Sequence, residues 1–176
     1  MTIVPQPPAA SPTPAAPGPR WEPRLYAGTL ATTSRVRSDL RTDLARLAGI
    51  GSDLVETVVL CASEMFANAV AHSRSGENGG RVIRTLAASA ASRSGSALRL
   101  SVIDDGARGS RPRIPRQRTP QEWQDAERGR GLLLIDHLAT AWGTRRVVDF
   151  PFCEGLGTVV WAEFTLDTPS TSGDAR

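Results

Sequence analysis

The sequence of 176 residues contains no lysine: its 21 residues of the Lys and Arg class are all arginine. This absence excludes a phosphate-binding loop of the Walker type, in which a lysine reaches the nucleotide phosphates. It also excludes Schiff-base chemistry and the strand lysine of eukaryotic-type protein kinases. Any phosphorylated ligand of this chain must therefore be held by other groups.

Cysteine is scarce as well, and its two copies, Cys61 and Cys153, lie far apart without a C-x-x-C pattern. This spacing supports neither a zinc site nor a disulfide framework. Cys61 sits in an apolar stretch, so we expect a small core residue rather than a reactive thiol. The net charge of +3 is modest and no basic helix with interleaved aromatics occurs, so we expect no direct contact with nucleic acid.

Long apolar runs are missing too. No stretch approaches the roughly 20 apolar residues that a membrane helix needs, and the first 20 residues lack the basic start and apolar run of a signal peptide. We therefore expect a cytoplasmic protein without a membrane segment. Residues 1–22 are rich in proline and alanine and are expected to be a disordered tail. One domain is expected at 23–167, followed by a polar, disordered tail at 168–176.

Hydrophobic spacing predicts the elements of that domain. A short strand is expected at 25–31, and an amphipathic helix at 32–47, where apolar residues recur at helical spacing. Ser52 is predicted to be the N-cap of a second helix that runs to about Ser73. Further strands are expected at 81–89, 97–105, 142–148 and 157–166, with a helix at 129–140. Residues 107–128 show no period and are predicted to form a lid.

The order of these elements predicts the fold class. Most strands are joined in hairpins, and the helices come in runs. This arrangement is typical of a two-layer α/β (α+β) sandwich, in which helices cover one face of a mixed, mostly antiparallel sheet.

Three polar features interrupt the apolar segments. Glu64 and Asn68 are four residues apart, so both side chains project from one face of the second helix. Alone, this pair equally fits the polar edge of a partly exposed helix. Asp104 ends an apolar strand and Gly106 follows it; the carboxylate suits an exocyclic amine such as that of adenine, and the glycine lets a flat ring approach. An ordinary Asp-Gly turn explains the same residues.

The third feature is the run Gly129-Arg130-Gly131-Leu132, which leads into a helix. Glycines allow backbone N–H groups to approach an anion, and the start of a helix adds a favourable dipole. The run lacks the third glycine of a dinucleotide fingerprint. Taken alone, it is equally a hinge that precedes a helix.

Together and in this order, the features resemble the Bergerat nucleotide-binding fold of the GHKL superfamily, which includes gyrase, heat-shock chaperones and histidine kinases. The sequence is most similar to the anti-sigma serine-kinase branch, whose first motif reads SE-x-x-x-NA-x-x-H. Ser63-Glu64, Asn68-Ala69 and His72 match this motif. The DDG box, the GRGL box and the closing pattern WG…GT-x-VW-x-E match as well, so the resemblance covers about residues 25–166.

The resemblance implies a site for ATP and Mg²⁺. Asn68 would hold the Mg²⁺ through its side-chain oxygen, and Glu64 would be the catalytic carboxylate. Asp104 would read the adenine amino group, Gly106 would let the ring approach, and Thr158 would support the adenine side. Gly129 and Gly131 of the GRGL box would bracket the phosphates, and Arg130 and Leu132 of the same box would belong to the cofactor-binding site. Arg128 and Arg130 flank the glycines, and they either touch phosphate, are solvated or face an acidic partner. His72 either contacts phosphate or simply ends the helix.

The resemblance also implies a function. The chain would be a protein-serine kinase that binds a sigma factor, phosphorylates a small antagonist protein, and pairs as a homodimer. An ATP-binding module that sequesters a partner without significant kinase activity remains the alternative. One position departs from the superfamily pattern: Arg108 stands where the second glycine of the adenine-side box normally lies.

Overall fold

The structure, a computed structural model, describes residues 17–92, 95–106, 130–147 and 157–166. Its strands are β1 (Pro17–Arg20), β2 (Arg24–Ala27), β3 (Arg81–Ser92), β4 (Gly95–Asp104), β5 (Ala141–Arg146) and β6 (Thr158–Leu166). Its α-helices are α1 (Thr33–Leu44), α2 (Ser52–His72) and α4 (Arg130–Leu138), and two 3-10 turns are η1 (Leu30–Thr32) and η2 (Arg74–Gly76).

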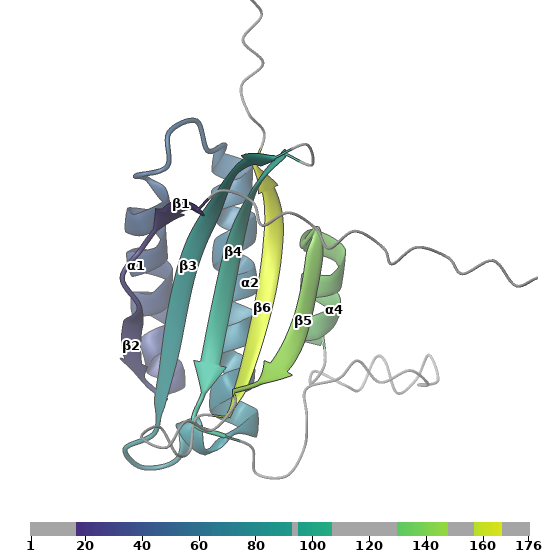
Figure 1. Ribbon diagram of the computed structural model, residues 1–176. Coiled ribbons are helices and arrows are strands. Elements are labelled where there is room, and N and C mark those ends of the chain that lie inside the picture. Colours follow the sequence, from purple (N-terminus) through teal and green to yellow (C-terminus); the bar gives the residue numbers. More distant parts are fainter. Residues whose placement is uncertain (1–16, 93–94, 107–129, 148–156, 167–176) are drawn as a thin grey trace, which may run out of the picture.

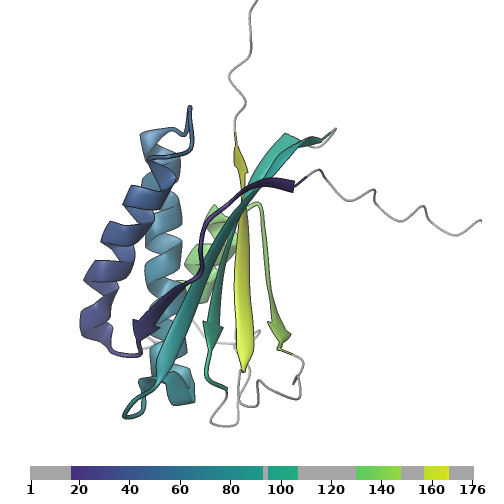
Figure 2. The ribbon, with the colours of Figure 1, turned by 60° about the vertical axis from the view of Figure 1, so that its left-hand side comes forward.

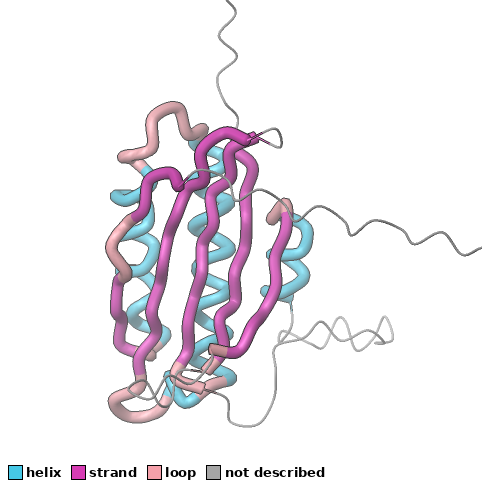
Figure 3. The backbone as a smooth tube through the Cα atoms, viewed as in Figure 1, coloured by secondary structure: helices cyan, strands magenta, loops and turns pink. Residues whose placement is uncertain are grey.

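The strands form one sheet in the order β1-β3-β4-β6-β5, with β2 also paired to β3. The pairings among the described strands are antiparallel. The helices cover one face of this sheet, as Figures 1 and 2 show from two directions. The tube in Figure 3 shows the strands side by side with the helices behind them. The predicted two-layer sandwich with a mostly antiparallel sheet is therefore confirmed.

The core lies between the two layers because side chains alternate along the strands. The buried positions of β3, β4 and β6 face the helices, and those of α1, α2 and α4 fall at helical spacing. The largest fully buried apolar side chains come from every layer: Val36, Leu40, Leu44, Val58, Met65, Phe66, Val82, Leu98, Leu100, Ile135 and Phe164. Tyr26 meets Phe66 edge to face, with ring centroids 6.1 Å apart.

Helix α2 is the central helix of the layer. By length and mean hydropathy this helix could cross a membrane, whereas the sequence was expected to contain no apolar stretch of that length. Its apolar side is nevertheless taken by the sheet and the neighbouring helices, since Cys61, Ala62 and Met65 are fully buried. Burial raises the pKa of the Cys61 thiol to about 11, and the nearby negative charge of Glu64 adds to the effect. Both facts fit a core helix with an inert thiol.

The ends of several elements differ from the prediction. Gly51, not Ser52, is the N-cap of α2, and no side chain caps it. The first predicted strand is shorter, because β2 ends at Ala27 and the chain then enters η1. Residues 17–20, expected in the N-terminal tail, form β1 and pair with β3 near Ala87 and Ser89. Periodicity cannot detect a four-residue strand of this kind, with two prolines and no apolar alternation.

A buried ion pair joins the sheet to α1. Arg84 of β3 donates to the carboxylate of Asp43, and both side chains are almost fully buried. Arg24 adds two hydrogen bonds to the same carboxylate, at 2.6 and 3.0 Å. Burial by itself raises the pKa of Asp43, but the hydrogen bonds from Arg24 and Arg84 outweigh it, so the pKa lies below its ordinary value of 3.8.

We predict that Asp43→Asn lowers the free energy of unfolding by about 3–5 kcal/mol at neutral pH, because Arg84 is left buried without its counter-charge. The folded-state pKa is lowered, so the contribution of the carboxylate is complete above the ordinary value of 3.8 and disappears as the pH falls through the folded-state value. Urea unfolding at a series of pH values should therefore show that the difference in free energy of unfolding between the unmodified chain and Asp43→Asn becomes smaller in acid.

The matched control is Asp39→Asn on the same helix. Asp39 forms longer ion pairs, at 3.6 Å with Arg24 and 3.7 Å with Arg35, and is partly exposed. We expect a loss below about 1 kcal/mol from this change. Equal losses from the two variants would contradict the structural role given to the Asp43–Arg84 pair.

Candidate functional site

Asp104 ends β4 and is held by backbone groups from two segments. Its Oδ1 accepts the N–H of Gly106 at 2.8 Å and the N–H of Thr158 at 2.9 Å. Its carbonyl accepts the N–H of Gly157 at 2.8 Å. The residue is only 7% exposed. Its Oδ2 makes no hydrogen bond with the described part of the chain.

Two glycines make this arrangement possible. Gly106 has φ of +97°, a conformation that favours glycine. A Cβ placed on Gly157 would overlap the backbone of Gly106 and Oδ1 of Asp104. The sequence predicted that Gly106 leaves room for a ring; the structure shows that the positive φ requires glycine there as well. Gly157 was part of the matched closing motif but was not predicted to be a site residue.

Thr158 contributes to this cluster through its backbone. It begins β6, is almost fully buried, and donates its N–H to Asp104. The register of the sheet explains the meeting, because Ile103 pairs with Val159 and the end of β4 therefore lies beside the start of β6. The support that Thr158 is expected to give to the adenine side stays a prediction; the contact that the structure shows is made by its main chain.

Glu64 and Gly131 bring the first and third sequence features together. Glu64 is half-buried on α2, and Gly131 lies in the first turn of α4 and is buried. A Cβ on Gly131 would lie only 2.5 Å from Oε2 of Glu64. The carboxylate therefore rests against the start of α4, where the dipole of a helix favours negative charge. A Cβ at this position would displace the end of the Glu64 side chain, so the glycine permits the contact.

Asn68 lies one turn beyond Glu64 on α2, as the spacing predicted. Its Nδ2 is buried and has no hydrogen-bond partner among the described residues. Because the two ends of an amide are assigned from their partners, this observation leaves one end of the side chain uncommitted to the protein. No group of three or more His, Cys, Asp or Glu residues that could hold a metal occurs in the described ranges. The amide oxygen of Asn68 by itself suits Mg²⁺, which usually takes one or two protein ligands and fills its shell with phosphate oxygens and water.

The remaining predicted residues fall in different places. Gly129 and the predicted lid, including Arg108, lie outside the described residues, and only the backbone of Arg130, the first residue of α4, is described. Leu132 is almost fully buried and belongs to the hydrophobic core, so its described role is to anchor α4. His72 is exposed and is the last residue of α2.

The turn after α2 supplies residues that the sequence analysis missed. Arg74 donates its backbone N–H to the carbonyl of Gly106 at 2.9 Å. Ser75 is buried, and its hydroxyl accepts the N–H of Asp105 at 2.9 Å. The end of α2, the end of β4 and the start of β6 thus lie at the same end of the sheet (Figure 1). The only available signal was two serines flanking an arginine after a helix, a pattern common in ordinary turns.

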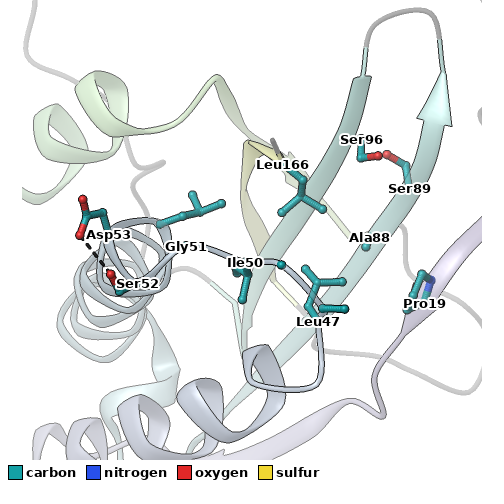
Figure 4. Close-up of a pocket in the computed structure, with 13 residues that line it drawn as sticks. Pro19, Leu47, Ile50, Gly51, Ser52, Asp53, Ala88, Ser89, Ser96 and Leu166 are labelled. Carbon is teal, nitrogen blue, oxygen red and sulfur yellow. Dashed lines mark hydrogen bonds between the residues drawn. The ribbon is translucent and has the colours of Figure 1, made fainter. Parts of the chain in front are cut away.

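A hollow of about 490 Å³ lies at the other end of the sheet. Its walls come from the loop between α1 and α2 and from the far ends of β3, β4 and β6. Figure 4 shows the side chains of Leu47 and Leu166 facing each other across it. Of the predicted site residues whose side chains the structure describes, none lines this hollow or the one beside Arg24 and Asp43.

Residues 26–162, most of the chain, match the family described as the histidine kinase-like ATPase domain. No curated protein matches the chain. The matched range contains both clusters, the one around Asp104 and the one around Glu64.

We predict that Gly157→Ala lowers the free energy of unfolding by about 1–3 kcal/mol, because the added methyl group would overlap Gly106 and Asp104. Gly51→Ser is the control, since a Cβ there meets nothing within 4 Å, its φ of −71° suits any residue, and serine is a favourable N-cap for α2. Urea unfolding monitors both. Equal midpoints for the two variants would show that the backbones at Gly106 and Gly157 are not held together.

Proposed function

The chain belongs to the histidine kinase-like ATPase domain family, and from that premise we propose that it is an ATP-binding protein-serine kinase of the anti-sigma factor type. The observation that carries the proposal is the carboxylate of Asp104, whose Oδ1 is committed to two backbone N–H groups. A carboxylate fixed in this way presents Oδ2 in a defined direction. Since its Oδ1 cannot turn away, Asp104 can select a ligand that carries an N–H donor, such as the exocyclic amine of adenine.

The phosphates would lie at the start of α4. The backbone around Gly131 offers the N–H groups and the dipole of a helix N-terminus to an anion. Asn68 would hold Mg²⁺ through its amide oxygen, and the ion, when bound, would bridge phosphate oxygens and neutralise their charge. Gly129 and Arg130 would complete the phosphate side, as the resemblance in the GRGL box implies.

Glu64 would act as the general base. Its carboxylate rests against Gly131, beside the position proposed for the phosphates, and it lies one helical turn from Asn68. From there it would accept the proton of the attacking serine hydroxyl as the oxygen bonds to phosphorus. A carboxylate is not needed at this place for binding alone, because its negative charge opposes that of the phosphates.

The partners of the proposed switch are a sigma factor, which it would bind, and an antagonist protein, which it would phosphorylate on serine. We further propose a cytoplasmic homodimer that contacts neither nucleic acid nor membrane. The support for this branch is the first motif, in which Ser63-Glu64 and Asn68-Ala69 match. The alternative, a sequestration module that binds ATP without phosphoryl transfer, would share the nucleotide site and lack the activity of Glu64.

We predict that Asp104→Ala weakens binding of ATP with Mg²⁺ by at least about tenfold, because the adenine amine loses a charged hydrogen-bond partner. Isothermal calorimetry measures the dissociation constant. Asp53→Ala, an exposed carboxylate at the far end of α2, should bind like the unmodified chain. Unchanged affinity in Asp104→Ala would remove the adenine-reading role.

We predict that Glu64→Gln lowers the rate of phosphoryl transfer by about 10²- to 10⁴-fold, because the amide cannot accept the proton. The measurement is transfer of label from γ-labelled ATP to a panel of candidate antagonist proteins. The ATP dissociation constant should not rise, because the variant loses a charge that opposes the phosphates. Glu56→Gln, two turns earlier on α2 and exposed, should transfer at the normal rate.

Two results would contradict this assignment. Transfer at the normal rate by Glu64→Gln would show that another group is the base. ATP binding by the unmodified chain, with no transfer to any antagonist in the panel, would favour the sequestration module.

A further inference from the structure

The turn after α2 connects the two clusters of the proposed nucleotide site. Ser75 lies in η2, three residues beyond the end of α2, and is 0% exposed. Its hydroxyl donates to the carbonyl of Arg81 at 2.6 Å and accepts the N–H of Asp105 at 2.9 Å. One hydroxyl thus joins the end of α2 to the start of β3 and to the residue that follows Asp104.

Neighbouring bonds reinforce this connection. Asp105 accepts the N–H of Arg81 on its carboxylate at 2.5 Å. Arg74 donates its backbone N–H to the carbonyl of Gly106 and its Nε to the carbonyl of Asp105, at 2.9 and 3.0 Å. The loop that carries Asp104 is therefore bonded at several successive groups to the turn after α2.

The turn itself has little room to move. A Cβ on Gly28 or on Gly80 would overlap the carbonyl of Ser75. The N–H of Gly28 also donates a hydrogen bond to the carbonyl of Gly80, at 2.9 Å. The main chain of Ser75 therefore lies against the backbones of the two glycines, which carry no side chain. This close packing fixes the turn relative to the end of β2 and the start of β3.

We propose that Ser75 is a positioning residue, which sets where Asp104 lies relative to Glu64 and Asn68. The inference rests on the proposed function, because the spacing matters only when one nucleotide is held at both clusters. Asn68 and Asp104 would contact opposite ends of that nucleotide. Fixing their separation in advance removes an entropic cost from binding and keeps the carboxylate aimed at the base.

The chain offers a matched pair of variants, Ser75→Ala and Ser73→Ala. Ser73 is also buried; its hydroxyl donates to the carbonyl of Ala69 at 2.6 Å and accepts the N–H of Ser75 at 3.0 Å. Each variant removes one buried hydroxyl with one donated and one accepted bond. Only the hydroxyl of Ser75 reaches the loop of Asp104.

The measurement is the ratio of the dissociation constants for GTP and ATP, both with Mg²⁺, by calorimetry. We expect the unmodified chain to prefer ATP, and the ratio to fall about tenfold in Ser75→Ala, the scale set by one misplaced buried hydrogen bond. Ser73→Ala should keep the ratio. A purely structural role would lower the thermal midpoint in both variants without changing the ratio in either.

A second variant covers the case in which Ser75→Ala does not fold. Asp105→Ala removes the bond to Arg81 from the partly exposed side of the same loop, and it should lower the ratio in the same way. An unchanged ratio in a folded Ser75→Ala or Asp105→Ala would overturn the positioning role and leave ATP binding intact. Failure of the unmodified chain to bind either nucleotide at millimolar concentration would remove the proposed function, and this inference with it.

Discussion

The carboxylate of Asp104 is the interaction on which the site depends. A buried carboxylate is costly unless hydrogen bonds satisfy it, and here two backbone N–H groups do so. Those bonds require a positive φ at Gly106 and close contact with Gly157. The same bonds that make the carboxylate tolerable also join the end of β4 to the start of β6. Fold and site are therefore constrained by the same atoms.

Much of the architecture could be predicted from the sequence because it follows from local periodicity. Helix α1 could be recognised from Val36, Leu40 and Leu44 at helical spacing, and all three are buried. The polar features could be recognised because acidic or amide side chains interrupted apolar segments, or because glycines preceded a helix. The order of the motifs then indicated that these features belong to one site, which none of them indicates alone.

The missed features depend on contacts between distant residues. Asp43 and Arg84 are 41 residues apart, and Ser75 and Asp105 are 30 apart. Nothing local distinguishes Arg84 in a strand from a solvated arginine, or Ser75 from any serine in a turn. The cap of α2 was assigned to Ser52 because serine is the commoner cap, whereas the loop glycine Gly51 occupies the position. Such choices are made by tertiary packing, which composition and spacing do not contain.

The charges at the phosphate side make two of the proposed assignments depend on each other. Glu64 places a negative charge against the start of α4, whose dipole supplies only roughly half a positive charge. A triphosphate at the same place would meet that carboxylate with several negative charges of its own. A divalent cation held by Asn68 would offset this repulsion, and the uncommitted amide lies one turn from the carboxylate. The two proposed roles therefore support each other: a carboxylate at Glu64 beside the phosphates calls for positive charge in the site, and Mg²⁺ at Asn68 would supply it.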